Sequence, residues 1–253
     1  MSEKSLSKIR AVVFDFGGVI MSYSLVSRMI EEMSMKIGIP IEKFLEGKTQ
    51  LWTRFEKCFE LMSGEITAKE FEETIWIQAI SQVYGIQVTE PIRWLTVKEK
   101  QQGVLNECML LLLRDLRKNG YKTALLSNCF FMNARSVEPI LPIDYSLYFD
   151  TVIESCQVGT HKPNRDIFEL MHSRLGDLGI GEPDEVLFLD DLPEYCAAAE
   201  MIGWNTVQVK SPSEAVEKVR ELLNLPTSEL LKVEKNLGKI ELEMKKTITE
   251  IGK

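Results

Sequence analysis

The sequence predicts a doubly wound parallel α/β sheet with a helical segment inserted after its first strand. Short apolar runs rich in β-branched residues recur along the chain, at residues 10–16, 121–128, 150–155, 186–191 and 205–209. Runs that are apolar almost throughout are typical of strands covered on both faces, as in a parallel sheet. Helix-period segments stand between several of these runs, and such alternation is typical of right-handed βαβ units.

The helical segments between the strands carry start and stop signals. The segment before the second strand ends in Asn119-Gly120, a natural helix stop. The last segment opens with Ser211, Pro212 and Glu214, which predicts a capping box with proline in the first turn.

The interval from residue 22 to residue 103 breaks the strand–helix alternation. It contains three amphipathic helical stretches, at residues 25–38, 51–64 and 67–80. The third begins with Thr67 and Glu70, again the pattern of a capping box. We therefore expect an α/β core made of residues 8–21 and 104–224, with an inserted helical cap over 22–103.

Residues 225–253 have a different composition and are predicted to form a charged helix. Their apolar residues recur at mostly three-four spacing, namely Leu230, Val233, Leu237, Ile240, Met244, Ile248 and Ile251. This pattern fits a coiled-coil-like seam used for self-association or partner binding. It also fits a long helix that lies on the body of the protein.

Composition and charge disfavour some classes of partner. The 253-residue chain has a formal net charge of −8, which argues against nucleic acid or an anionic membrane as the main partner. Its apolar runs are too short to span a bilayer, and its first ten residues lack the apolar stretch that is typical of a secretory signal. Five scattered cysteines without a C-x-x-C pair favour reduced, buried thiols and a cytoplasmic location.

Reactive side chains stand at the ends of three predicted strands, and one more stands in a loop between a strand and a helix. The strand-end residues are Asp15, Ser127, Asn128, Asp190 and Asp191, and the loop residue is Lys162. In an open parallel sheet the carboxyl ends of the strands share one crevice, so these residues can converge. Three carboxylates would repel one another and a phosphate unless a divalent cation such as Mg²⁺ lay between them. The set therefore predicts a site for a magnesium ion and an anion.

The ordered segments "FDFGGVI", "LLSN", "VGTHKPNRDIF" and "FLDD" resemble the four motifs of the haloacid dehalogenase superfamily. Within it, they are most similar to the branch that contains the N-terminal phosphatase-like domain of soluble epoxide hydrolase. The helical insertion is similar to the superfamily's C1 cap on a Rossmann-like core. The resemblance covers residues 8–224 and leaves the C-terminal helix outside.

This resemblance implies a role for each matching residue. Asp15 matches the nucleophile that forms an aspartyl-phosphate, and Lys162 matches the cation that neutralises the nucleophile and the transferred group. Ser127 matches the residue that hydrogen-bonds the phosphoryl oxygens, and Asn128 shapes the same loop. The implied substrate is a small phosphorylated molecule.

The resemblance also implies a Mg²⁺ site. Its ligands would be Asp15, Asp190 and Asp191, together with the backbone carbonyl of Gly17, which needs no side chain.

Gly17 is also the main departure from the family pattern, because an acid that protonates the leaving oxygen ordinarily stands there. Loss of a positioned general acid–base costs about a hundredfold to ten-thousandfold in rate. His161 and Tyr195 are conceivable replacements, although a loop histidine and a packing tyrosine explain them better. Family members often carry asparagine where Tyr195 stands.

The sequence is compatible with three functions. The first is a slow magnesium-dependent phosphatase that prefers good leaving groups such as acyl or aryl phosphates. The second, favoured by Gly17 and by the charged C-terminal helix, is a phosphate-binding or interaction protein without efficient turnover. The third, carbon–halogen hydrolysis, fits poorly because Asp190 and Asp191 suit a metal.

Overall fold

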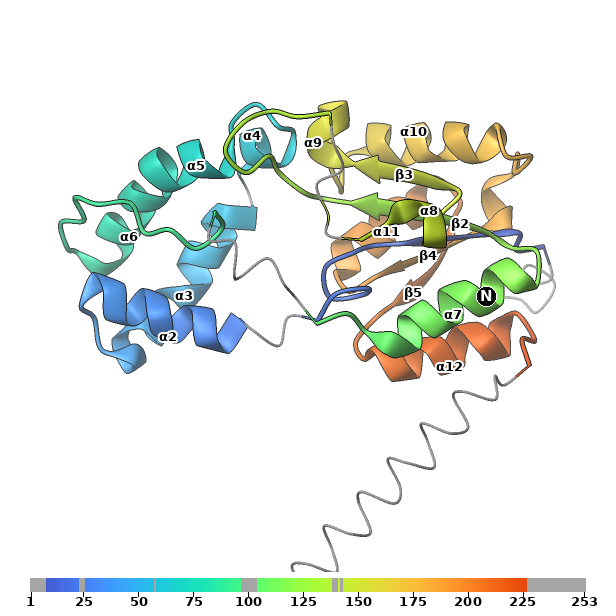
Figure 1. The fold of residues 1–253 in the computed structure, drawn as a ribbon, viewed down its shortest axis with the longest axis horizontal. Coiled ribbons are helices and arrows are strands. Elements are labelled where there is room, and N and C mark those ends of the chain that lie inside the picture. The colour runs from blue at the N-terminus through green and yellow to red at the C-terminus, as the bar shows by residue number, and fades with distance from the viewer. Residues whose placement is uncertain are drawn as a thin grey trace, which may run out of the picture.

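Five parallel strands form one sheet, and their carboxyl ends point toward a separate group of helices (Figure 1). The computed structural model describes residues 8–22, 26–56, 58–96, 104–137, 141 and 143–226. The predicted C-terminal helix beyond Pro226 lies outside the described residues.

The strands lie within the ranges that the sequence predicts, in the spatial order β3-β2-β1-β4-β5. They are β1 (Ala11–Phe14), β2 (Lys122–Ser127), β3 (Thr151–Glu154), β4 (Val186–Asp190) and β5 (Asn205–Gln208). The chain builds the sheet in one direction from β1 to β3 and in the other from β4 to β5. The order therefore reverses between β1 and β4, which is where open α/β sheets bind their ligands.

Helices cover both faces of the sheet, so the predicted doubly wound α/β fold is confirmed. One face carries α7 (Glu107–Lys118) and α12 (Pro212–Leu222), and the other carries α10 (Arg165–Gly176) and α11 (Pro193–Met201). Alternate residues of each strand serve the two faces, because successive side chains of a strand point to opposite sides. In β1, for example, Val12 packs with α7, whereas Val13 packs with α10. Three short helices complete the core: α8 (Tyr145–Tyr148), α9 (Ser155–Val158) and the 3₁₀ turn η3 (Pro183–Glu185).

Most of the predicted helix ends are observed, with one correction. Helix α7 ends at Lys118, and Gly120 follows with φ +82°, a conformation that glycine adopts without strain. Helix α12 begins at Pro212, but Ser211 makes no side-chain capping bond, so the predicted capping box is wrong. Its hydroxyl lies 3.1 Å from that of Ser213 instead.

The helices between β1 and α7 enclose a hydrophobic cluster of their own, and we call residues 26–96 the helical insertion. Its elements are α2 (Val26–Ile37), α3 (Ile41–Glu56), α4 (Phe59–Met62), α5 (Ala68–Phe71), the π-helix η1 (Glu72–Trp76) and α6 (Ile77–Tyr84). The capping box of Thr67 and Glu70 is present. The expected single helix over 51–64 is wrong, because Cys58 leaves helical geometry (ψ 82°) and caps a new helix, α4.

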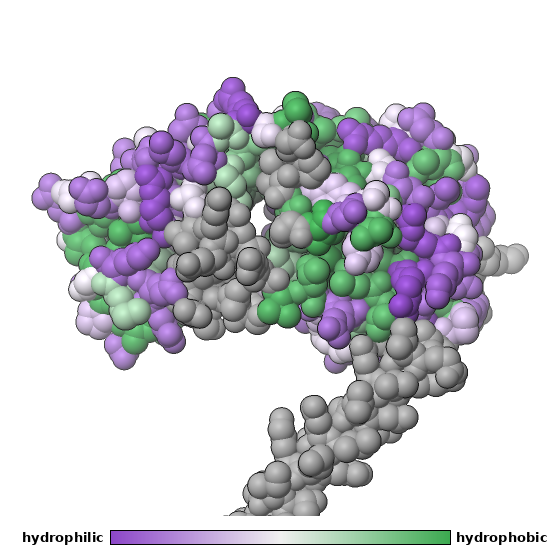
Figure 2. All heavy atoms as spheres, in the orientation of Figure 1, coloured by the Kyte–Doolittle hydropathy of each residue, from purple (hydrophilic) through white to green (hydrophobic). Residues whose placement is uncertain are grey.

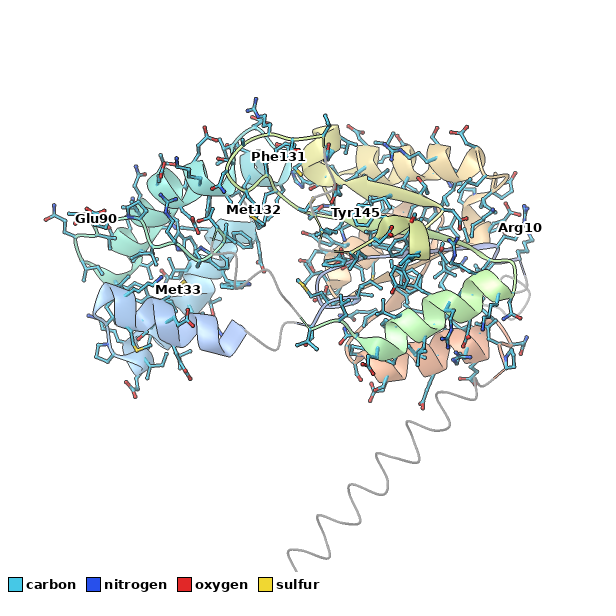
Figure 3. The ribbon with its side chains drawn as sticks, viewed as in Figure 1. Arg10, Met33, Glu90, Phe131, Met132 and Tyr145 are labelled. Atoms are coloured by element: carbon cyan, nitrogen blue, oxygen red, sulfur yellow. The ribbon has the colours of Figure 1, made fainter. Side chains whose placement is uncertain are left out.

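The loop after β2 joins the core to the helical insertion. Its Phe131 carbonyl accepts a hydrogen bond from Ala68 N–H at 2.7 Å, and Met132 accepts one from Lys69 N–H at 3.0 Å. On the neighbouring strand end, Ser155 Oγ donates to the Met62 carbonyl at 2.6 Å. Figure 3 shows Phe131 and Met132 at this junction. The insertion is thereby held close to the carboxyl end of the sheet.

The visible surface is mixed in character. The outer rims of the core and of the helical insertion are mainly hydrophilic, while hydrophobic atoms gather on the part of the core nearest the insertion (Figure 2). None of the described helices combines the length and apolarity that a membrane span requires.

Candidate active site

Asp15 follows the last residue of β1 and lies beside the end of β4. Its N–H donates to the Leu189 carbonyl at 2.9 Å, which continues the pairing of Phe14 with Leu189. This register brings Asp15 alongside Asp190, the last residue of β4. Two carboxylates far apart in sequence therefore meet at the point where the strand order reverses.

Lys162 places its ammonium group between these two carboxylates. Its Nζ lies 2.7 Å from Asp15 Oδ1 and 2.6 Å from Asp190 Oδ2. All three residues are buried, and Lys162 is only 1% exposed. A charged group with so little access to water is tolerated only when it is paired, and here the ammonium is paired twice.

The charges of the site perturb one another. Burial alone would lower the pKa of Lys162, but the adjacent Asp15 and Asp190 carboxylates outweigh it and raise that pKa. Burial raises the pKa of Asp15 to about 7, although the Lys162 ammonium favours the charged carboxylate. Burial and the charge of Asp190 raise the pKa of Asp191 to about 6. Such perturbed acids in one cluster are a common property of functional sites.

The carboxylates of Asp15, Asp190 and Asp191 offer oxygens that all lie within 4.8 Å of one another. Three carboxylates facing one ammonium leave two negative charges, which a divalent cation would neutralise. Oxygen ligands of this kind suit Mg²⁺. Among the described residues, no backbone N–H donates to the Gly17 carbonyl, the further ligand that the resemblance implies. The residues present therefore fit a magnesium ion.

Ser127 and Asn128 lie at the end of β2, the strand next to β1. Asn128 binds the backbone of Lys162 on both sides: Oδ1 accepts from the Lys162 N–H at 2.8 Å, and Nδ2 donates to the Lys162 carbonyl at 2.9 Å. Ser127 is buried, and among the described residues its hydroxyl has only a long contact of 3.4 Å with the Asn128 carbonyl. The predicted site residues thus come from the ends of β1, β2 and β4 and from the loop before α10.

His161 does not have a free ring nitrogen to replace the missing acid at position 17. Its Nδ1 lies 2.9 Å from the Lys162 carbonyl, and because a carbonyl only accepts, Nδ1 carries the proton. Its Nε2 faces Asn164 Nδ2 at 3.4 Å. The ring stacks on Phe59 of α4 with centroids 4.9 Å apart. His161 therefore acts as a packed contact between the core and the helical insertion.

Two contacts of the site carry no signal in the sequence. One is the stacking of Phe59 on His161, between residues about a hundred positions apart. The other joins Asn128 to Tyr195, whose hydroxyl lies 3.1 Å from Asn128 Nδ2. Each depends on how distant elements pack, which no local pattern in the sequence indicates.

The family model of haloacid dehalogenase-like hydrolases matches residues 9–203. The chain belongs to this family. The predicted recognition and the fold class are therefore confirmed, and the residues of the site described above all lie within the matched range.

Several curated proteins are similar to this chain. The chain is 31% identical over 220 residues to mouse acyl-CoA dehydrogenase family member 10, covering 86% of the chain and 19% of that protein. It is 28% identical to pig bifunctional epoxide hydrolase 2, covering 85% of the chain and 39% of the relative. The chain thus spans only a minor part of these longer proteins. A D-ribitol-5-phosphate phosphatase of Bacteroides thetaiotaomicron is 27% identical, with 85% of the chain and 99% of the relative covered.

Solved structures share the fold. A haloacid dehalogenase family enzyme from Bacteroides thetaiotaomicron, in complex with magnesium and inorganic phosphate, aligns with a TM-score of 0.52 at 24% identity. The alignment covers 80% of this chain and 94% of that one. At this level of identity the likeness concerns the fold.

Proposed function

We propose that this chain is a magnesium-dependent phosphatase that hydrolyses a small phosphate ester or acyl phosphate through an aspartyl-phosphate on Asp15. The observation that carries the proposal is the buried Lys162 ammonium, 2.7 Å from Asp15 and 2.6 Å from Asp190. This arrangement supports the proposal, because the carboxylate proposed as nucleophile and a carboxylate able to bind a metal both lie against one ammonium group. Support also comes from a full-length relative named as a phosphatase of a sugar-alcohol phosphate.

In this proposal Asp15 attacks phosphorus with one carboxylate oxygen, and the bond from phosphorus to the leaving oxygen breaks. Lys162 offsets the negative charge of the nucleophile and of the phosphoryl group as they approach. Ser127 donates its hydroxyl hydrogen to a phosphoryl oxygen. Asp15, Asp190, Asp191 and the Gly17 carbonyl would hold Mg²⁺, which supplies further positive charge to the phosphate when bound.

Gly17 sets the expected limits of the reaction. Without an acid at this position, the leaving oxygen departs unprotonated, and the water that cleaves the aspartyl-phosphate lacks a general base. The rate loss is about a hundredfold to ten-thousandfold and falls hardest on alkyl phosphates, whose alkoxide is a poor leaving group. Acyl and aryl phosphates depend less on that proton, so we expect them to be the better substrates.

The test is phosphate release from p-nitrophenyl phosphate and acetyl phosphate, with Mg²⁺ and with EDTA. Wild-type protein should release phosphate only with Mg²⁺, and Asp15→Asn should lose this activity. The exposed residue Asp177 provides the matched control, since Asp177→Asn makes the same chemical change away from the site. Equal background release by wild type and Asp15→Asn would reject the phosphatase.

Gly17 also favours a second candidate, a member of the fold that binds a phosphate ligand without efficient turnover. Isothermal titration with Mg²⁺ and inorganic phosphate would show binding in the absence of release. A gain of alkyl-phosphate hydrolysis in Gly17→Asp would identify the missing acid as the handicap. If that variant stays inactive while wild type binds phosphate, the binding function is favoured.

A further inference from the structure

Tyr195 contacts Lys162 directly through its ring and is linked to it indirectly through Asn128. It lies in the first turn of α11, a few residues after the carboxylates that end β4. Its ring centroid is 5.0 Å from the Lys162 ammonium, within the range of a cation–π contact. Its hydroxyl lies 3.1 Å from Asn128 Nδ2, and Asn128 in turn binds the backbone of Lys162. One side chain therefore contacts the charged end of Lys162 and, through Asn128, its main chain.

The hydrogen bonds around Asn128 define the direction of this network. Its Oδ1 accepts from the Lys162 N–H, so Nδ2 must face the Lys162 carbonyl and donate to it. The second Nδ2 hydrogen then points to the Tyr195 hydroxyl, which acts as the acceptor. Burial raises the pKa of Tyr195 to about 12, which keeps the hydroxyl neutral. Both hydrogens of the Asn128 carboxamide therefore have an acceptor, and Tyr195 provides the second one.

We propose that Tyr195 is a positioning residue that, together with Asn128, holds the Lys162 ammonium between Asp15 and Asp190. A lysine side chain has four flexible carbons, and it gains rotational freedom unless its surroundings restrict it. The Asn128 carboxamide fixes the backbone from which the side chain starts. The Tyr195 ring closes one side of the ammonium group. The inference rests on the proposed phosphatase function insofar as the held ammonium is the one that meets phosphate.

Tyr195 also packs at the edge of the cluster under α10 and α11, so a structural role has to be separated from a positioning one. Two variants do this. Tyr195→Phe keeps the ring and its packing but removes the hydroxyl that accepts from Asn128. Tyr195→Leu removes the ring over the ammonium as well. Tyr121→Phe is the matched control, because it makes the same chemical change at the opposite end of the sheet, where the Tyr121 hydroxyl contacts the Leu223 carbonyl at 3.4 Å.

The first measurement is an NMR spectrum of the Asn128 side-chain amide, assigned by comparison with Asn128→Asp. In wild type both hydrogens should exchange slowly with water, because both are hydrogen-bonded. Tyr195→Phe should shift this signal and speed the exchange of one hydrogen, whereas Tyr121→Phe should leave it unchanged. An Asn128 signal that is identical in wild type and Tyr195→Phe would overturn the proposal.

The second measurement is Mg²⁺ affinity by titration calorimetry, together with kcat and KM for acetyl phosphate. Partners that orient the residues of a metal site typically contribute about tenfold to a hundredfold in affinity or activity. We expect about a tenfold fall in kcat for Tyr195→Phe, a larger one for Tyr195→Leu, and little change in KM. Equal melting temperatures for wild type and Tyr195→Phe would show that the loss does not come from unfolding.

These readouts separate the two proposals. If wild type binds Mg²⁺ but releases no phosphate, the phosphatase fails, while the Asn128 signal and the Mg²⁺ affinity still test Tyr195. If wild type is active and Tyr195→Phe equals it in kcat and in Mg²⁺ affinity, the positioning role of Tyr195 is wrong and the phosphatase stands.

Discussion

Lys162 is the residue whose removal should disturb the site most. Lys162→Met keeps the length of the side chain but leaves Asp15 and Asp190 facing each other without a cation. Breaking a buried ion pair by removing one partner typically costs about 3–5 kcal/mol. Urea unfolding in EDTA should therefore show a loss of this size, and the exposed residue Lys210 provides the control through Lys210→Met. Equal stabilities of wild type and Lys162→Met would contradict the pairing.

The acids of the site make the stability of the metal-free protein depend on pH. Asp15 and Asp191 have pKa values of about 7 and about 6, above the ordinary value of about 4 for an aspartate. An acid with a raised folded-state pKa stabilises the fold below its unfolded pKa, and this contribution disappears as pH rises through the folded pKa. In EDTA the stabilisation from these two acids should therefore decline between about pH 4 and pH 7. Melting temperatures measured across this range test the decline.

Magnesium should reverse that trend, because the carboxylates must lose their protons to bind a metal. The rise in melting temperature on adding Mg²⁺ should be small at pH 5 and should grow toward pH 8. Asp15→Asn removes one of the two acids whose pKa is raised. The rise in melting temperature on adding Mg²⁺ should therefore be smaller in this variant and should depend less on pH. A magnesium effect that is constant from pH 5 to pH 8 would speak against this assignment.

At the scale of single elements, the turn after α4 shows how tightly the helical insertion meets the core. Gly64 has φ +76°, and an added Cβ would lie 2.4 Å from the Cys156 carbonyl oxygen. Gly38 has a similar φ of +69°, but an added Cβ there would meet nothing within 4 Å. A substitution at Gly38 therefore adds backbone strain without a collision. Gly38→Ala should therefore cost about 1 kcal/mol.

Gly64→Ala should cost more than Gly38→Ala, by about 2 kcal/mol, because the new methyl group would collide with rigid backbone. Chemical denaturation of both variants measures the difference. Similar losses in the two variants would mean that the turn can move away from Cys156 without penalty.

The π-helix at Glu72–Trp76 shows a further constraint on one element. Glu72 is fully buried, and its Oε1 accepts hydrogen bonds from the N–H groups of Trp94 and Leu95, each at 2.6 Å. A carboxylate with such partners holds the chain that returns toward the core. The helical periodicity of this stretch indicates a helix, and it does not indicate a buried acid, because the partners lie some twenty residues away.

At the scale of the whole molecule, the sheet and the helical insertion have separate hydrophobic clusters. A ligand stabilises only against those openings that destroy its site. Bound Mg²⁺ should therefore slow hydrogen exchange in β1 and β4 more than in α3 and α6, as measured by mass spectrometry with and without EDTA. Equal slowing in all four elements would mean that core and insertion open as one unit.

Much of the core follows from local patterns. Apolar runs predicted all five strands, and a sheet buried on both faces requires such runs whatever the contacts of each side chain. Helix α7 ends just before Asn119-Gly120 as expected, because a glycine adopts a positive φ without strain whatever its distant contacts. Cys58 shows the limit of such patterns, because the 51–64 stretch keeps its helical periodicity although the helix is interrupted there.

The sequence by itself determined which residues stand at the strand ends, and their order predicted that Asp15, Lys162 and Asp190 would meet. Only the tertiary structure decided how they are held, by Asn128 on the Lys162 backbone and by Tyr195 over its ammonium. The reason is physical: propensities, caps and periodicity act over a few residues, whereas a contact between distant side chains depends on the distance and angle that the whole sheet imposes.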